Sequence, residues 1–206
     1  MSMIHFNTEL RTKPDGFRLT RENYIDMTRV SKDGVKHTAI KCEKMAENAL
    51  ENFDLNMQYF KALDKEEFNI ALDSFLSRHP KFKEVLDLNE YKGVPGYYII
   101  VLDEYCQVYI GTAEDIKRRI MAHWSKNMPL DRLVFGHVDR SVLSIDSFRA
   151  LDTTRIFAYG TEQLYSKEDD FINDFPDKYF INRTRGGLMQ FGLIEAIANK
   201  KGRNLR

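Results

Sequence analysis

The chain has 206 residues and a mass of 24.2 kDa, enough for one domain or for one domain with an appendage. Hydrophobic residues make up 43% and charged residues 30%, a balance that excludes a disordered chain, a collagen-like chain and a disulfide scaffold. Lys and Arg total 31, as do Asp and Glu, so net charge alone gives no argument for a polycation that binds nucleic acid nonspecifically.

The cysteine pattern and the N-terminal residues bear on the compartment. Cys42 and Cys106 form no C-x-x-C motif and no zinc spacing with the five histidines, which favours a reducing environment. The first residues lack the basic-then-apolar layout of a signal peptide. The longest apolar run, residues 97–102, is too short to span a bilayer. We therefore expect a cytoplasmic protein, from a bacterial or a phage-infected cell.

The first ninety residues contain an irregular arm followed by helices. Turn signals in residues 1–35 favour an arm with a short strand or hairpin. Apolar residues at three- and four-residue steps predict a helix over 38–63. Asp64, with Glu67 three residues on, resembles a capping box that opens a second helix, and His79-Pro80 ends it. A further short helix is expected over 81–88.

The second half changes to alternating strands and helices. Aromatic and β-branched residues predict strands at 97–102 and 105–110, and the short polar link makes them an antiparallel hairpin. We expect an α+β fold, with a small antiparallel sheet flanked by helices in residues 91–206 and a helical extension in residues 1–90. The other expected elements are helices at 115–126, 161–175 and 191–200, strands at 131–136 and 154–159, a turn or short helix at 146–152 and a turn at Gly186-Gly187.

The most informative stretch begins with Gly96-Tyr97-Tyr98 and continues, ten residues later, with Tyr109-Ile110-Gly111. Because strand side chains alternate, Tyr98 and Tyr109 are able to share one sheet face. Arg119 and His123 follow four residues apart, on one face of the next helix. Each feature alone is common, since paired tyrosines usually reflect cross-strand packing. The ordered set resembles the GIY-YIG nuclease family, with Tyr97 in place of the isoleucine of the first triplet.

The resemblance covers residues 93–190 and implies an activity. Glu162 and Asn182 stand in the order in which the family places a glutamate and an asparagine. The resemblance implies a metal-dependent endonuclease that hydrolyses DNA phosphodiester bonds, most like the restriction-endonuclease-type branch. It implies one Mg²⁺ (or Mn²⁺) per site, bound by Glu162, because Mg²⁺ commonly needs only one or two carboxylates beside water and phosphate.

The family roles transfer to six catalytic positions. Arg119 would neutralise the scissile phosphate, a task for which its fixed guanidinium fork is suited. Tyr98 or Tyr109 would take the proton of the attacking water, and the sequence leaves open which one. His123 would assist the base or the leaving group. Asn182 would orient a neighbour or the phosphate.

Basic residues give candidate DNA contacts. Lys117 and Arg118 adjoin the catalytic helix residues, and Arg155 lies on a predicted strand. Arg183 and Arg185 open a basic C-terminal segment in which Glu195 is the one acidic residue. In each case the alternative is an ordinary solvated side chain. The acidic run of residues 168–170 is interpreted as a solvated helix face, with a second metal site as the alternative.

The sequence alone leaves several alternative functions open. Double-stranded DNA is the expected substrate, with RNA as an alternative. Because cutting both strands requires two active sites, a restriction-type enzyme is expected to form a homodimer. The first alternative is a phage or repair nuclease that nicks one strand as a monomer. The others are a catalytically idle DNA-binding module and a helical interaction protein. Residues 1–90 would serve target recognition, dimerisation or both.

Overall fold

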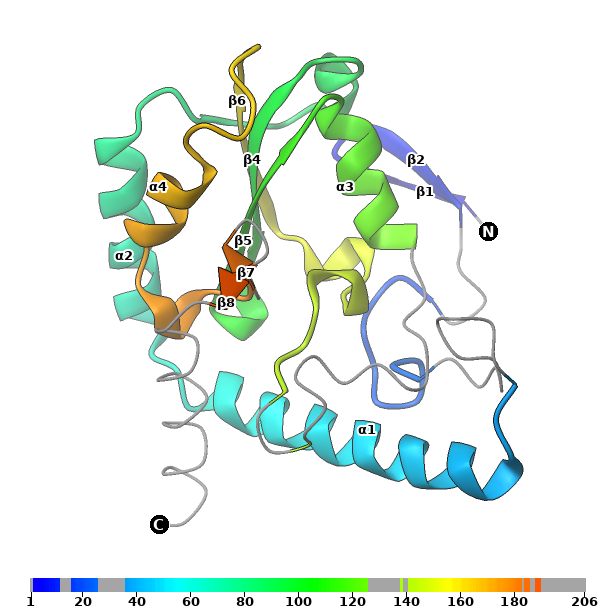
Figure 1. Cartoon of the computed structure of the whole chain (residues 1–206). Coiled ribbons are helices and arrows are strands. Elements are labelled where there is room, and N and C mark those ends of the chain that lie inside the picture. The colour runs from blue at the N-terminus through cyan, green and yellow to red at the C-terminus, as the bar shows by residue number, and fades with distance from the viewer. Residues whose placement is uncertain are drawn as a thin grey trace.

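The computed structural model describes residues 2–11, 16–25, 36–125, 138, 141–182, 184–185 and 188–189. A four-stranded antiparallel sheet with strand order β3-β6-β4-β5 lies at its centre (Figure 1). These residues therefore have the predicted α+β architecture. The strands of the sheet are β3 (Lys83–Glu84), β4 (Gly96–Leu102), β5 (Gln107–Ala113) and β6 (Arg155–Gly160).

The predicted hairpin is confirmed and is longer than expected. A 3-10 turn at Asp103–Tyr105 and a left-handed residue, Cys106, join β4 to β5. β5 continues through Gly111 to Ala113, so the second triplet lies inside the strand rather than at its end. Every residue of β4 is buried, because the strand is central and structure covers both of its faces.

Strand alternation sends the side chains of β4 into two separate hydrophobic clusters. Tyr97, Ile99 and Val101 pack with residues of two helices on one face. Tyr98, Ile100 and Leu102 pack with residues of the other elements on the opposite face. The first face carries α2 (Lys65–Arg78) and α4 (Glu168–Asn173); the second carries α1 (Ala39–Lys61), α3 (Ile116–Ser125) and the hairpin of β1 (Ser2–His5) and β2 (Thr8–Arg11) (Figure 1).

The two long helices start and end near the predicted residues. Thr38 caps α1 by accepting a hydrogen bond from the Lys41 backbone amide. Asp64 caps α2 in the same way, accepting from the Glu67 amide at 2.8 Å. α2 ends before His79, as the following proline predicts. Within the described segments, no helix combines the length and the apolar character needed to cross a bilayer.

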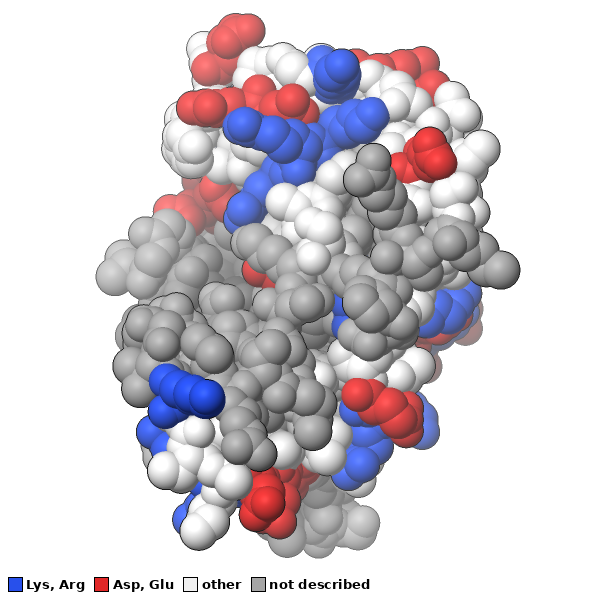
Figure 2. All heavy atoms as spheres, turned by 90° about the vertical axis from the view of Figure 1, so that its right-hand side faces the viewer, with Lys and Arg blue, Asp and Glu red and all other residues white. Residues whose placement is uncertain are grey.

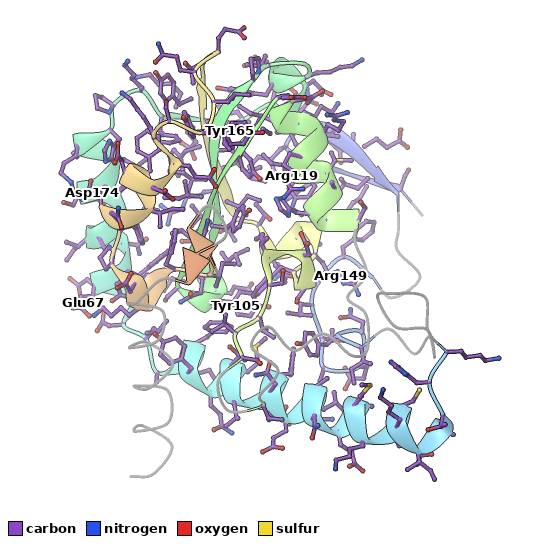
Figure 3. The ribbon with its side chains drawn as sticks, viewed as in Figure 1. Glu67, Tyr105, Arg119, Arg149, Tyr165 and Asp174 are labelled. Carbon is purple, nitrogen blue, oxygen red and sulfur yellow. The ribbon has the colours of Figure 1, made fainter. Side chains whose placement is uncertain are left out.

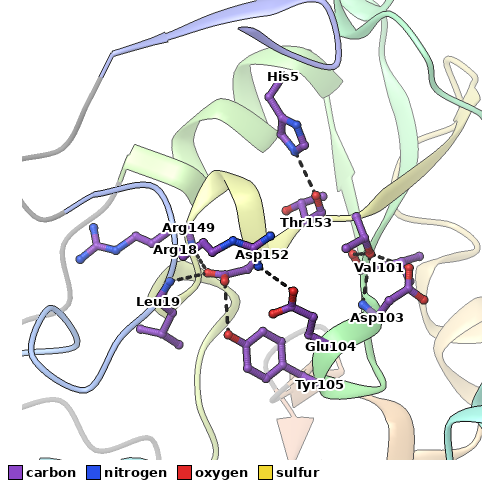
Figure 4. A network of polar contacts seen from close by, with 11 residues as sticks. His5, Arg18, Leu19, Val101, Asp103, Glu104, Tyr105, Arg149, Asp152 and Thr153 are labelled. Atoms are coloured by element: carbon purple, nitrogen blue, oxygen red, sulfur yellow. Dashed lines mark hydrogen bonds and ion pairs between the residues drawn. The ribbon is translucent and has the colours of Figure 1, made fainter. Parts of the chain in front are cut away.

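The N-terminal ninety residues share the sheet and the core of the second half. β3 pairs with β6, and residues of β2 and α1 lie in one hydrophobic cluster with β4 and α3. The buried carboxylate of Asp152 joins the two halves, because it accepts hydrogen bonds from the Leu19 amide (2.9 Å), the Arg149 amide (2.7 Å) and the Tyr105 hydroxyl (3.2 Å) (Figure 4). The arm is therefore fixed by buried polar contacts as well as by apolar packing.

Two predicted helices are wrong. Residues 81–88 contain β3 and the start of a 3-10 helix at Leu88–Tyr91, because Lys83 and Glu84 pair with β6. Of the helix predicted over 161–175, only α4 forms. The Tyr97 hydroxyl donates to the Gln163 carbonyl and accepts from the Lys167 amide, which ties residues 161–167 to the sheet as a loop.

Other predicted elements stand as follows. The turn or short helix expected at 146–152 is confirmed as 3-10 turns at Ile145–Ser147 and Ala150–Asp152. The strand predicted at 131–136, the helix at 191–200 and the turn at 186–187 lie outside the described residues. On either side of that turn, β7 (Thr184–Arg185) and β8 (Leu188–Met189) pair antiparallel.

Candidate active site

An open pocket of about 680 Å³ lies beside β5, between the first turns of α3 and the start of α4. Its lining contains two basic side chains, three acidic ones and two phenols. Arg119 reaches it from α3 and Tyr165 from the loop before α4 (Figure 3). Most of the lining residues are polar or charged, which suits a charged ligand better than an apolar one. The polar lining residues are Tyr109, Thr112, Glu114, Asp115, Arg118, Arg119, Tyr165 and Glu168.

The two tyrosines share one face of the hairpin, as the strand alternation predicts. Tyr98 pairs with Gly111 and Ile100 pairs with Tyr109, so the two phenols are diagonal neighbours with ring centroids 6.1 Å apart. Tyr98 has no exposed surface, whereas Tyr109 borders the pocket. The structure thus distinguishes the two tyrosines by their exposure to the pocket, which the sequence does not.

At Gly96 and Gly111, the glycines of the two triplets, any larger residue would clash with neighbouring atoms. A Cβ on Gly111 would lie 2.5 Å from the Tyr98 hydroxyl oxygen and 2.9 Å from a ring carbon of Tyr109. Gly96 has φ +151°, and a Cβ there would lie 2.1 Å from the Tyr159 carbonyl oxygen. Gly96 therefore allows the close approach of β6, and Gly111 leaves room for the tyrosine pair.

Arg119 contacts both phenols. Its guanidinium lies close enough to the Tyr98 and Tyr109 hydroxyls to interact electrostatically with both. Burial raises the pKa of Tyr98 well above its ordinary value, and the Arg119 charge opposes that rise. Burial likewise raises the pKa of Tyr109, again opposed by Arg119. A guanidinium between two phenols favours their ionised forms, which is the state that accepts a proton.

α3 is held in the orientation that directs Arg119 to the tyrosines. The Asp115 carboxylate caps the helix by accepting from the Arg118 amide at 2.8 Å, and the Ile116 amide donates to the Val94 carbonyl. On the adjacent helix face, the predicted apolar stripe is buried against the sheet. That stripe consists of Ile116, Ile120 and Trp124.

His123 is buried behind the tyrosines. Its Nε2 lies 2.8 Å from the Tyr98 hydroxyl oxygen, and its Nδ1 lies 2.5 Å from a carboxylate oxygen of Asp146. Asp146, on the 3-10 turn Ile145–Ser147, is itself buried. The sequence gives no signal for this residue, because an aspartate in a short turn is ordinary.

Of the two glutamates in this part of the chain, Glu168 lines the pocket and Glu162 does not. Glu168 is the first residue of α4 and is half-buried; burial, with the neighbouring Asp169, raises its pKa, and Arg119 lowers it. Glu162 is exposed and is not among the pocket residues. The sequence predicts one long helix from residue 161, on which Glu168 would belong to a solvated face.

The donor set allows one kind of metal site. Among the described residues, no group of three His, Cys, Asp or Glu side chains is arranged to hold a metal ion. A site with one protein carboxylate suits Mg²⁺, which retains several waters and takes further oxygens from a substrate phosphate. The half-buried Glu168 carboxylate lines the pocket together with Arg119 and fits this mode, whereas Glu162 is exposed and lies outside the pocket lining.

The Asn182 side chain is hydrogen-bonded to the backbone of β5. Asn182 is buried, and its side chain accepts from the Ile110 amide at 2.9 Å and donates to the Ile110 carbonyl at 2.5 Å. The Ile181 amide donates to the Val108 carbonyl, so this segment runs along the outer edge of β5. Asn182 therefore fixes the strand that carries Tyr109, and it does not line the pocket.

The basic candidates divide into two groups. Arg118 is exposed and lines the pocket, and Lys117 donates to the Asn89 side chain at 2.5 Å nearby. Arg155 is bound to Asp103 and Asn69 and pairs with Val101, at the opposite end of the strands from Gly96. Figure 2 shows Lys and Arg side chains gathered on the α3 side of the molecule, with acidic side chains around them. Arg183 and the side chain of Arg185 lie outside the described residues.

Comparisons with known proteins give no relative for this chain. No family model matches it, and neither the curated proteins nor the solved structures contain a match.

Proposed function

We propose that the chain is a metal-dependent endonuclease of the GIY-YIG type, acting on DNA phosphodiester bonds. The observation that carries the proposal is the contact of Arg119 with both Tyr98 and Tyr109 beside a polar pocket that Glu168 also lines. Phosphodiester hydrolysis requires a proton acceptor, a positive charge for the phosphoryl oxygens and a group that binds the metal. These three requirements are met by residues from three different elements around one pocket.

Each side chain has a role that its position supports. Arg119, free to turn one side of its guanidinium to the pocket, stabilises negative charge on the phosphate. The tyrosine pair takes the proton of the attacking water, with Tyr109 at the pocket and Tyr98 behind it. His123 stands next to Tyr98 as the group that receives or returns that proton. Asn182 keeps β5 in place.

Glu168 is the residue we assign to the metal. When bound, Mg²⁺ (or Mn²⁺) supplies a Lewis acid for the phosphate and lowers the pKa of water. Glu168 would hold that ion. Burial, with the neighbouring Asp169, raises the pKa of its carboxyl group, and Arg119 lowers it. Asp169, its neighbour, is exposed.

The pocket rim is suited to nucleic acid. Tyr165 is 67% exposed and adopts a left-handed backbone conformation, φ +65°, which is unusual for a bulky residue. Its ring at the pocket edge is suited to stack on a nucleobase. Arg118 at the same rim is suited to bind the backbone phosphate next to the cleaved one. A restriction-type enzyme that acts as a homodimer on double-stranded DNA is the form of the proposal that we favour.

Cleavage of supercoiled plasmid with Mg²⁺, beside an EDTA control, tests the proposal. Arg119→Ala is expected to lower the rate by about 100-fold or more, the usual loss for a residue that stabilises transition-state charge. Glu168→Gln is expected to lower it similarly. Glu162→Gln is the matched control and should leave the rate within about threefold, since Glu162 is exposed away from the pocket.

The products distinguish the forms of the activity. Discrete EDTA-sensitive fragments indicate a sequence-specific enzyme, and an accumulating nicked circle indicates a nuclease that cuts one strand. Equal loss in both glutamate variants would remove the assignment of the metal to Glu168. Absence of cleavage on several DNA and RNA substrates, with binding intact, would contradict the nuclease proposal.

A further inference from the structure

Behind the pocket, three side chains form a continuous hydrogen-bonded series that starts at Asp146. The carboxylate of Asp146 contacts Nδ1 of His123 at 2.5 Å, and Nε2 of His123 contacts the Tyr98 hydroxyl at 2.8 Å. The three residues come from a 3-10 turn, α3 and β4. Their side chains are buried, with 2% of His123 and 8% of the Asp146 side chain exposed.

The partners of the two ring nitrogens of His123 favour one position for the ring proton. An ionised carboxylate only accepts hydrogen bonds, so Nδ1 must donate to Asp146. In the neutral ring Nε2 is then the acceptor, and the Tyr98 hydroxyl donates to it. Removing the Asp146 carboxylate removes the acceptor that favours this tautomer, and the alternative tautomer places a hydrogen on Nε2, where it opposes proton transfer from Tyr98.

We propose that Asp146 is a positioning residue that holds His123 in the Nδ1–H tautomer and so makes Nε2 the proton acceptor for the tyrosine pair. The inference rests on the proposed nuclease function. One proton leaves the attacking water for the tyrosine pair, and one proton passes from Tyr98 to Nε2. The tyrosine pair is unchanged at the end of the step. The resulting imidazolium lies between the Asp146 carboxylate and Tyr98, and the carboxylate stabilises its charge.

The surroundings of His123 support this direction of transfer. Tyr98 and Tyr109 face the ring from the two strands, with ring centroids 6.0 and 5.1 Å away. Arg119, on the same helix, contacts both phenols and favours their ionised forms. Asp146 supplies the negative charge on the opposite side of the ring. A proton is therefore drawn from the arginine side of the site toward the aspartate side.

The first measurement is the tautomer of His123 in the full chain without substrate. Long-range ¹H–¹⁵N spectra resolve the ring nitrogens, and five histidines make assignment by substitution practical. We expect Nδ1 of His123 to be protonated and Nε2 to be unprotonated at neutral pH. Asp146→Asn should shift the population toward the other tautomer, and Ser147→Ala, in the same 3-10 turn, should leave it unchanged. A parent protein in the Nε2–H tautomer would overturn the inference whether or not the chain cuts DNA.

The second measurement uses cleavage rates. Asp146→Asn should lower kcat by about 100-fold or more with KM within about threefold, and should move the rising limb of the pH–rate profile. In a His123→Gln background the same change should cost less than about threefold, because Asp146 acts through His123. Additive losses in that double variant, or a lower kcat with an unmoved pH profile, would show a merely structural role. A parent without any cleavage would contradict the proposed function alone, since the tautomer test is independent of it.

Discussion

Tyr97 and Tyr98 are adjacent on β4, equally buried, and on opposite faces of the sheet. Within the described residues, the Tyr97 hydroxyl forms hydrogen bonds to two backbone groups, the Gln163 carbonyl and the Lys167 amide. The Tyr98 hydroxyl contacts side chains that carry or exchange charge, Arg119 and His123. Burial alone therefore does not distinguish these two tyrosines, whereas the chemistry of their partners does.

The largest expected difference between the two faces is in activity. Tyr98→Phe should lower the cleavage rate by about 100-fold or more, because it removes a hydroxyl from the proton path while keeping the ring. Tyr97→Phe should leave the rate within about threefold and lower the free energy of unfolding by about 1 kcal/mol, the usual net value of a lost hydrogen bond. Cleavage assays and denaturant unfolding measure both variants. Equal rates for the two would contradict the distinction between the faces.

A methyl group on the Tyr98 face is expected to have the next largest effect. Gly111→Ala places a Cβ 2.5 Å from the Tyr98 hydroxyl oxygen, so the phenol must move away from His123. We expect a rate loss of about 100-fold, a size typical of a displacement near 1 Å. Overpacking should also cost about 1–3 kcal/mol in stability.

Gly160→Ala is the control for that change. Its Cβ would lie 3.2 Å from a methyl group of Val94, away from the tyrosine pair. We expect activity close to that of the parent. A rate for Gly111→Ala equal to that of Gly160→Ala would show that the tyrosine pair has more freedom than the packing implies.

A small effect on cleavage is also expected at Asp152, which resembles Tyr97 in having mainly backbone partners. Asp152→Ala leaves the Leu19 and Arg149 amides without their buried acceptor and should cost about 2 kcal/mol of stability, measured by denaturant unfolding, with cleavage little changed. Asp152→Asn keeps an acceptor oxygen and should cost less.

The pH dependence of stability sharpens the Asp152 prediction. Burial raises the pKa of the Asp152 carboxyl group in the folded protein. The stability that this raised pKa represents is fully present below the unfolded value, about 4, and is lost as pH rises through the folded pKa. Asp152→Asn should therefore gain stability relative to the parent as the pH rises above about 4. A constant difference above that pH would contradict the assigned direction.

The residues that the sequence predicted well are those whose position follows from local periodicity. Tyr98 and Tyr109 share a face because strands alternate, and Arg119 and His123 share a helix face because they are four apart. Asp64 and the proline after His79 likewise predicted the bounds of α2. These inferences needed only neighbouring residues.

The failures have a long-range cause. The loop at 161–167 is hydrogen-bonded to Tyr97, some seventy residues earlier in the chain, and α4 therefore starts only at Glu168. As a result Glu168, and not Glu162, lines the pocket. Asp146 reaches His123 only through the tertiary packing of its turn against α3. Local propensity carries no information on either contact.

The contact of Asn182 with β5 has a consequence for how copies of the chain meet. A free strand edge invites pairing with another molecule, and Asn182 occupies both backbone groups of Ile110 in the middle of that edge. At the other edge, β3 has only two residues, Lys83 and Glu84, both charged. Extension of the sheet from one copy into the next is therefore disfavoured at both ends, and a cooperative pair of subunits would have to form through helices or through the N-terminal arm.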